Sequence, residues 1–379
     1  MKLLDRYVTR QVLSTSTYAV SILSVVLVLG NVFKKLLDLL INQNIPAEQL
    51  LSFVAYILPV SLTFTIPWGF LTAVLLVFGK MSAENELIAL RSNGVSIPRI
   101  CMPVFAIALI FVAICTWINV DVAPRAETKM KDALYNIAMS NPLAMFGGDK
   151  VIDEFPDKKI YVEKHNGPEL ENILVYEVSE DYNPIRVVFA KRGILSIDRA
   201  NNQLLLQLTQ AQFELRDTQE PQNLLKLQRG VAFETTFPIS LEELQNRSKK
   251  RKGLSSLTVN ELEERLSQEK AGKLSKSDAK RAAAERSSAR TEVSKRFSFA
   301  MASFAFGLIG IPLAMTAHRK ETSVGFLLSL IVAFVYFCLI ILIDTVRENP
   351  ALHPELLIWS PNLIFIGLGA WLFYRLSRR

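Results

Sequence analysis

Six long apolar segments, in two groups of three, limit most strongly how this chain can fold. None of the six contains Asp, Glu, Lys or Arg, and each approaches or exceeds the ~20 residues with which a helix crosses ~30 Å of hydrocarbon. The sequence therefore predicts a membrane protein of six transmembrane helices, with one large soluble insert between the third and the fourth. The segments cover residues 11–33, 51–79, 100–120, 297–317, 324–343 and 356–374.

Basic residues gather in the segments that six spans place on one side of the membrane, namely both termini and two short loops. The positive-inside rule makes that side the cytoplasm, so the insert is expected on the opposite side. Topology then accounts for much of the net charge of +7, which therefore does not indicate a nucleic-acid partner. The basic residues concerned are Lys2, Arg6, Arg10, Lys80, Arg91, Arg99, His318, Arg319, Lys320, Arg375, Arg378 and Arg379.

Within the insert, the sequence between residues 159 and 237 alternates between apolar and polar positions, and turn residues such as Asn166-Gly167-Pro168 interrupt it. Several short strands without helices between them favour an antiparallel sandwich, a jelly roll or a partly open barrel. The apolar positions expected to face the core of these strands are Ile160, Val162, Ile173, Val175, Ile185, Val187, Phe189, Leu204, Leu206 and Leu208.

A helix-rich stretch follows the expected strands. Residues 257–268 carry leucines among Glu and Arg, and residues 277–295 are rich in Ala, Arg and Glu and are expected to continue directly into the fourth span. The sequence thus predicts four parts. They are residues 1–120 with the first three spans, 121–254 as a β domain, 255–296 as a helical linker and 297–379 with the last three spans.

Motifs for catalysis or metal binding are missing from the sequence. It contains neither a phosphate-binding Gly-x-x-x-x-Gly-Lys-Ser/Thr loop nor a Gly-x-Ser-x-Gly elbow, and its three histidines lie in different segments. No acidic residue lies within a span, where proton-driven carriers usually place one. We therefore expect a protein that is not an enzyme, that binds no metal or cofactor, and that takes energy for any transport from another subunit.

The loop between the second and the third spans has the most distinctive local sequence. Ser82 is a favoured N-cap residue, the helix dipole favours Glu84 and Glu86 in a first turn, and Gly94 is a favoured helix end. These residues predict a short helix over residues 82–93.

This expected helix has an apolar edge that includes Leu87 and Leu90. A short amphipathic helix under a membrane domain is what a transporter would offer to a soluble ATPase. An ordinary interfacial loop helix has the same pattern, so the residues alone leave both interpretations open.

The loop at 79–94 resembles that of the lipopolysaccharide-export permeases, the LptF/LptG (YjgP/YjgQ) family, in its acid-x-acid pair, its Ala-Leu-Arg and its terminal glycine. Two further matches are Asp-Arg-Tyr at 5–7 and Lys-Arg-Phe at 295–297, the latter continuing to Gly-Ile-Pro-Leu-Ala at 310–314. The three-plus-three layout with a β insert matches along essentially the whole chain. The loop leans to the LptF type, although the sequence leaves the LptF and LptG roles open, and the charged stretch 248–294 is more elaborate than the family pattern.

The resemblance implies a permease subunit of an ABC transporter in the bacterial inner membrane. Such a subunit pairs with a second LptF/LptG-type permease and with an LptB-type ATPase dimer, which carries the ATP and Mg²⁺. Lipopolysaccharide would leave the outer leaflet of that membrane and pass through a periplasmic β-jellyroll. LptC- and LptA-type jellyroll proteins would receive it.

By the same resemblance, the helix at 82–93 would be the coupling helix that docks in the ATPase. Its expected contact residues are Glu84, Glu86, Leu87, Leu90 and Arg91.

Four basic residues are candidates for binding the lipid headgroup, namely Lys34, Lys35, Arg125 and Lys129. They follow the first and the third spans, at the depth where the phosphates of lipid A lie, and charge-assisted contacts there are strong. The alternative is that these side chains only anchor the helix ends at the membrane interface.

Two rival functions stay open on the sequence. One is a membrane-anchored periplasmic assembly or sensor protein without transport activity. The other is a mechanotransmitting ABC subunit of the macrolide-exporter type, although that type usually has four spans with the insert after the first.

Overall fold

The computed structural model describes residues 2–42, 47–140, 150–152, 158–178, 184–198, 203–215, 227–240, 253–268, 276–316 and 322–378. The chain divides into two compact units. The helical unit comprises Met1–Val32, Leu51–Met130 and Gly253–Arg379, and the β unit comprises Phe33–Leu50 and Lys131–Lys252.

Six helices of the described chain are long and apolar enough to cross a membrane, which confirms the three-plus-three prediction. The fourth of them starts well before its apolar part, as predicted for residues 277–295. The six are α1 (Lys2–Asn42), α2 (Ala47–Ala83), α4 (Ile97–Trp117), α8 (Lys276–Thr316), α9 (Thr322–Asp344) and α11 (Ser360–Arg378).

Shorter elements connect these helices. A π-helical turn, η1, joins α4 to α5 without a break, so that the chain leaves the third span as a helix. The connecting elements are α3 (Glu86–Ser92), η1 (Ile118–Val122), α5 (Ala123–Ser140), η4 (Leu254–Ser256), α7 (Val259–Gln268), η6 (Pro350–Leu352) and α10 (Pro354–Leu357).

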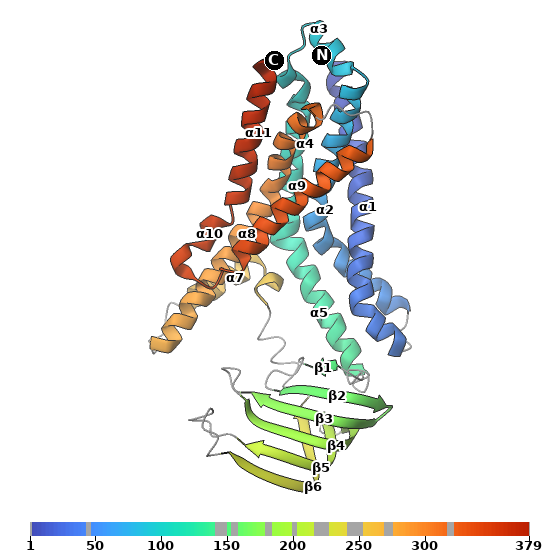
Figure 1. Ribbon diagram of the computed structural model, residues 1–379, viewed down its shortest axis with the longest axis vertical. Helices are drawn as coiled ribbons and strands as arrows, with labels where there is room; N and C mark the ends of the chain where they lie inside the picture. The colour runs from blue at the N-terminus through green and yellow to red at the C-terminus, as the bar shows by residue number, and fades with distance from the viewer. Residues whose placement is uncertain are drawn as a thin grey trace. The chain divides into compact units, whose positions relative to one another are not determined.

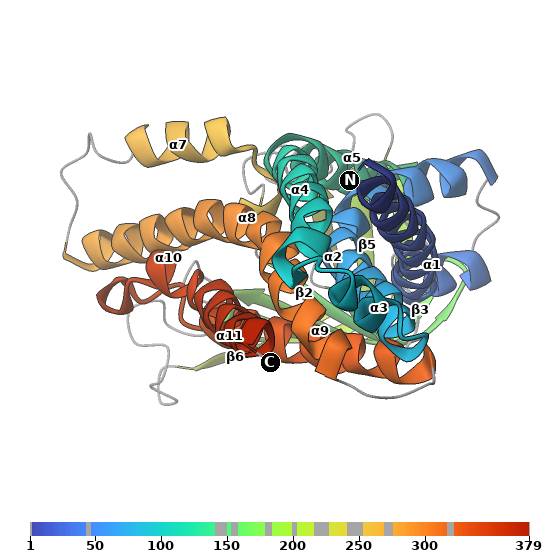
Figure 2. The ribbon, with the colours of Figure 1, turned by 90° about the horizontal axis from the view of Figure 1, so that it is seen from above.

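In the helical unit, both chain termini and α3 lie at the same end, as the distribution of basic residues requires (Figure 1). α1 and α11 lie on opposite sides of the bundle with α2 between them (Figure 2). The helices of the bundle also differ in how far they are buried. The apolar stretches of α2 and α8 are 67% and 72% buried, whereas those of α1 and α11 are only 28% buried. α2 and α8 therefore form the centre of the bundle.

A buried tyrosine joins three of the spans. Tyr336 of α9 is fully buried and packs edge-on against Phe306 of α8 and Phe365 of α11, at centroid distances of 5.0 and 5.6 Å. Its hydroxyl donates to Oδ1 of Asn362 (3.2 Å), whose Nδ2 donates to the backbone oxygen of Ser298 (2.8 Å). Polar groups at membrane depth find no water, so these mutual bonds are what permits them in the bundle.

Glycines let two pairs of helices pack backbone against backbone. A Cβ atom added to Gly69 of α2 would lie 2.9 Å from the backbone nitrogen of Val20 in α1. One added to Gly369 of α11 would lie 3.0 Å from the backbone nitrogen of Ile309 in α8. Small residues at such contacts are typical of helices that associate within membranes.

The β unit contains one antiparallel sheet in which every described strand pairs with its neighbours in sequence, in the order β1 to β6. This confirms the predicted membrane-helical fold with an inserted all-β domain and supplies the strand order, which the sequence left open. The strands are β1 (Lys150–Ile152), β2 (Lys158–Asn166), β3 (Glu169–Val178), β4 (Pro184–Asp198), β5 (Gln203–Leu215) and β6 (Gln228–Ser240).

The sheet curves (Figure 1), and the strand register places the side chains of its apolar core on one face. Each core side chain is at most 2% exposed, and all of them come from β2 to β5. They are Ile160, Val162, Leu170, Ile173, Val175, Val188, Ala190, Leu195, Leu204, Leu206, Leu208 and Ala211.

Strand β4 turns toward the core of the sheet the face opposite to the one predicted. Alternation placed Val187 and Phe189 inward with Ile185, whose side chain lies outside those that the structure describes. In the sheet Val188 is fully buried, opposite Val175, and Phe189 is 42% exposed. Both faces of this part of β4 are apolar, so pairing with β3, not alternation, decides which face turns inward.

We predict that Gly69→Ala lowers the thermal stability of the protein, because the new methyl group forces α1 and α2 apart. Overpacking of this kind costs about 1–3 kcal/mol. Gly79→Ala is the control, since a Cβ atom at that position of the same helix meets nothing within 4 Å. Melting temperatures in detergent measure both variants, and equal values would contradict the backbone contact.

Candidate functional site

The helix predicted over residues 82–93 is shorter in the structure and begins later. α2 continues to Ala83, so Ser82 lies in its last turn and does not cap a new helix, and α3 covers only Glu86–Ser92. Met81 is 1% exposed, and this burial extends α2 beyond the apolar span. The chain turns at Asn85, whose φ of 59° lies in the left-handed region that Asn tolerates better than most residues.

The end of α3 is where Gly94 predicts it. Gly94 has a φ of +81°, its N–H donates to the backbone oxygen of Arg91 (2.9 Å), and the N–H of Val95 donates to that of Leu90 (3.1 Å). This is the Schellman arrangement, which pairs carbonyls that a helix end otherwise leaves free. α3 is therefore a short helix with a well-defined end.

The predicted contact residues in and just before α3 differ in exposure. Leu87 is 7% exposed and Leu90 is half-buried, and both pack into the core of the helical unit. Glu84 and Arg91 are exposed, and Ile88 is a large apolar side chain that is 61% exposed. The sequence contains adjacent apolar residues at 87 and 88, and only packing shows which of them faces outward.

Side-chain contacts join α3 and the start of α4 to the first helix. The hydroxyl of Tyr7 donates to both carboxylate oxygens of Glu86, at 3.0 Å each. Nη2 of Arg99 in α4 pairs with Oδ2 of Asp5 at 2.6 Å. Bonds to charged groups are stronger than neutral ones, so the Asp-Arg-Tyr motif at 5–7 holds α1 against the loop that carries α3.

The candidate headgroup residues lie on two helices. Lys34 and Lys35 belong to α1, which continues to Asn42, and their side chains lie outside those that the structure describes. Arg125 pairs with Asp121 at 2.5 Å, yet 66% of its side chain is exposed. Lys129 is exposed one turn further along α5, on the same face as Arg125.

Across the described residues, no group of three or more His, Cys, Asp or Glu side chains lies close enough together to hold a metal ion.

The sequence matches the family model of the lipopolysaccharide export system permeases LptF/LptG over residues 6–375. The chain belongs to the LptF/LptG family. The lipopolysaccharide export system permease protein LptF of Escherichia coli (strain K12) is 22% identical over 380 residues, which cover 96% of this chain and 92% of that protein. LptF of Shigella flexneri matches equally well, and an uncharacterized protein of Rickettsia prowazekii is 26% identical over 165 residues, 42% of this chain and 44% of that protein.

Membership of the LptF/LptG family confirms the family resemblance that the sequence indicated. With the six apolar helices, it makes this chain a membrane permease of a lipopolysaccharide export system and not a catalytic enzyme.

We predict that Tyr7→Phe loosens α3, because Glu86 loses the hydroxyl that holds it. A hydrogen bond to a charged group is worth about 1–1.5 kcal/mol at an accessible position, so amide hydrogens of α3 should exchange about 5–10 times faster. Tyr18→Phe, at a 72% exposed position of the same helix, is the control. Hydrogen–deuterium exchange followed by mass spectrometry measures both, and an unchanged rate in Tyr7→Phe would show that the bond does not hold α3.

Proposed function

We propose that this LptF/LptG-family chain is one permease subunit of an ABC transporter that extracts lipopolysaccharide from the outer leaflet of the bacterial inner membrane. An LptB-type ATPase dimer, which binds ATP and Mg²⁺, docks on α3 in the cytoplasm. The observation that carries the proposal is the form of α3, a firmly held helix that exposes one large apolar side chain among charges. It lies at the end of the helical unit that holds both termini (Figure 1).

The outer face of α3 is suited to a protein partner. Ile88 is an apolar anchor, and the exposed Glu84 and Arg91 lie on either side of it in sequence. Protein interfaces commonly draw most of their binding energy from such an anchor, whereas charges at the rim steer association.

The inner face of α3 connects a docked ATPase to the spans. Leu87 packs into the same core cluster as residues of α1, α2 and α4, and Glu86 binds Tyr7 of α1. A displacement of α3 therefore reaches the first three spans through contacts that are already in place. Leu87 and Leu90 act in this proposal as internal links, and Ile88 takes the place of the apolar contact residue.

The outer helices of the bundle supply the faces for lipid and for the second permease. The apolar stretches of α1 and α9 are only 28% buried within this chain, so most of their apolar surface is available to a neighbour. In this proposal a second LptF/LptG-type permease faces them, and the two chains enclose a cavity for lipid between them. α1 and α9 then form the lateral entrance of that cavity.

The β unit receives the lipid on the periplasmic side and passes it to LptC- and LptA-type jellyroll proteins. Its curved apolar face has the chemistry that acyl chains require. The core side chains of that face are each at most 2% exposed in this structure, so passage of acyl chains along them requires the sheet to open. In this proposal basic residues beyond a span bind the phosphates of the headgroup, either Arg125 and Lys129 of α5 or Lys34 and Lys35 of α1.

We expect Ile88→Asp to reduce the amount of ATPase that co-purifies with the chain by more than about tenfold, because loss of an interface anchor costs ~2 kcal/mol or more. The variant should still insert and still bind the second six-span permease. Leu3→Asp is the matched control, since Leu3 is an 84% exposed apolar residue in the first turn of α1. The measurement is quantitative mass spectrometry of the purified complex.

Two results would contradict this proposal. One is a wild-type chain that purifies without an ATPase or a second six-span chain. The other is an Ile88→Asp variant that retains the ATPase as fully as Leu3→Asp does, which would place the docking surface elsewhere.

A photo-crosslinking amino acid at Lys129 or at Lys34 should capture lipopolysaccharide in intact cells, because both positions are proposed to lie at the depth of its phosphates. The control position is Met102, which is 61% exposed near the start of α4, at the α3 end of the bundle. Immunoblotting for lipopolysaccharide on the captured chain measures the outcome. Capture at Met102 but not at the two lysines would move the headgroup site.

A further inference from the structure

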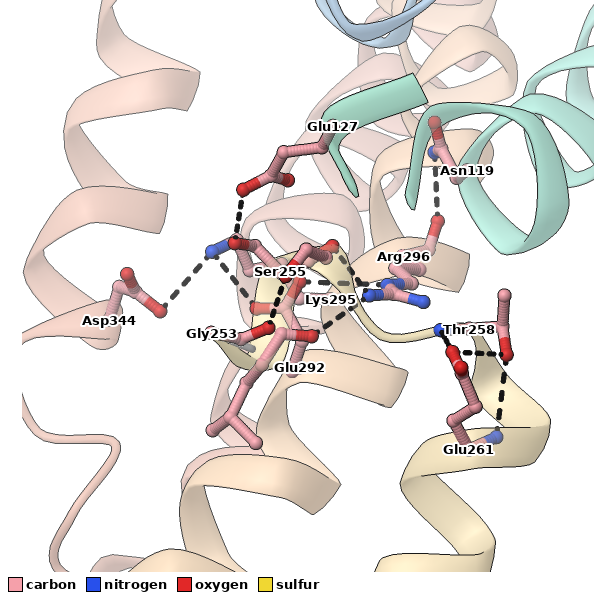
Figure 3. A network of polar contacts seen from close by, with 12 residues as sticks. Asn119, Glu127, Gly253, Ser255, Thr258, Glu261, Glu292, Lys295, Arg296 and Asp344 are labelled. Atoms are coloured by element: carbon pink, nitrogen blue, oxygen red, sulfur yellow. Dashed lines mark hydrogen bonds and ion pairs between the residues drawn. The ribbon is translucent and has the colours of Figure 1, made fainter. Parts of the chain in front are cut away.

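Arg296, the central residue of the Lys-Arg-Phe motif, is 5% exposed and lies at the point where α8 meets the segment that returns from the β insert. Its Nη2 donates to the backbone oxygens of Leu254 (3.1 Å) and Ser255 (3.0 Å), and its Nε lies 3.5 Å from Oε1 of Glu292 (Figure 3). Leu254 and Ser255 belong to η4, the first described turn after the β unit. A buried cation of α8, directly before the fourth apolar segment, therefore holds the backbone of the returning chain.

The same turn is bonded to α5, the helix by which the chain leaves for the insert. The hydroxyl of Thr128 donates to the backbone oxygen of Ser256 (2.9 Å), and the hydroxyl of Ser255 donates to Oε1 of Glu127 (2.7 Å). The outgoing and the returning connection are thus fastened to one another where both join the helical unit. We call Glu127, Thr128, Ser255, Ser256 and Arg296 the Arg296 clasp.

Neighbouring residues extend the clasp to two further elements. Asn119 of η1, which is 3% exposed, donates from Nδ2 to the backbone oxygen of Arg296 at 3.1 Å. Nζ of Lys295 lies 3.4 Å from Oε2 of Glu292 and 3.4 Å from Oδ1 of Asp344, the last residue of α9. Polar contacts in this region therefore join η1, α5, η4, α8 and α9 (Figure 3).

The partners of Arg296 make its effect depend on conformation. A buried guanidinium is costly unless it is paired and hydrogen-bonded. Two of its acceptors are backbone oxygens of η4, which are in reach only when the returning segment is docked. Undocking would remove both backbone acceptors and leave Glu292 as the ion-pair partner of Arg296, so Arg296 favours the docked arrangement.

We propose that Arg296 is a positioning residue for lipid export: it closes the clasp, so that a movement of α8 reaches both connections of the β insert together. The export role rests on the proposed function, whereas the closing of the clasp does not. This assigns a purpose to the Lys-Arg-Phe motif, which the docking of an ATPase on α3 leaves unexplained.

The first test is limited proteolysis of the full-length chain in its purified complex. Arg296→Gln should be cleaved within residues 253–268 at least ~10 times faster than wild type, because bonds to a charged donor are lost and the open segment becomes more populated. Arg290→Gln, at an exposed position of the same helix, should be cleaved at the wild-type rate. Arg296→Lys should lie between them, since a single ammonium nitrogen cannot replace both Nη2, which binds the two oxygens of η4, and Nε, which faces Glu292.

The second test measures lipopolysaccharide transferred per ATP hydrolysed, in proteoliposomes that contain the complete complex. We expect Arg296→Gln to lower this ratio by about tenfold while the ATPase still co-purifies, because α3 is unchanged. Cysteines at Thr128 and Ser256, joined by a short bifunctional thiol crosslinker, should restore the ratio in Arg296→Gln. The same two cysteines in a chain that keeps Arg296 are the control, and they measure the effect of the cysteine substitutions and the crosslinker alone on the ratio.

The outcomes separate the clasp from the proposed function. Wild-type cleavage rates in Arg296→Gln would overturn the clasp, and a normal transfer ratio or failure of the crosslinker to restore it would overturn the positioning role. If Arg296→Gln does not assemble, the double variant Thr128→Val with Ser255→Ala opens the clasp from α5 and must show the same faster cleavage. If the wild-type complex transfers no lipopolysaccharide, the proposed function fails, and proteolysis still decides whether the clasp exists.

Discussion

The absence of water from the hydrocarbon core of a membrane governs most of this structure. Backbone groups there can bond only to one another, so each of the six apolar segments must be a helix. Polar side chains at that depth are costly unless they bond to partners within the bundle. Asn362 shows the consequence, since it bonds to both Tyr336 and Ser298 and thereby joins three helices with one side chain.

The same constraint places the charged contacts at the two ends of the bundle. At one end, Asp5 and Tyr7 of the first helix bind Arg99 and Glu86 of the loop region. At the other end, Arg296 binds the backbone that returns from the insert. Two of the motifs by which the family is recognised thus hold segments that are distant in sequence, and both act where the spans meet the segments that connect them.

Much of the fold follows from sequence patterns that need no tertiary information. Which face of an individual helix or strand turns inward does not follow from those patterns. The six spans, the continuous α8 and the antiparallel insert were predictable, because length, charge and alternation are local properties of the sequence. Phe189 and Ile88 were assigned wrongly or missed, because each is next to an apolar residue, Val188 or Leu87, that competes for the same core. Where two neighbours are equally apolar, periodicity cannot decide between them.

The sequence by itself determined that the chain spans a membrane six times, which ends of its helices share a side, and that an all-β insert separates the triplets. It did so because apolar length and the distribution of basic residues are read from the chain one segment at a time. Only the tertiary structure decided that α3 begins at Glu86, that Ile88 is its outward side chain, and that Arg296 holds η4. Each of these depends on contacts between segments far apart in sequence, whose energies no local pattern contains.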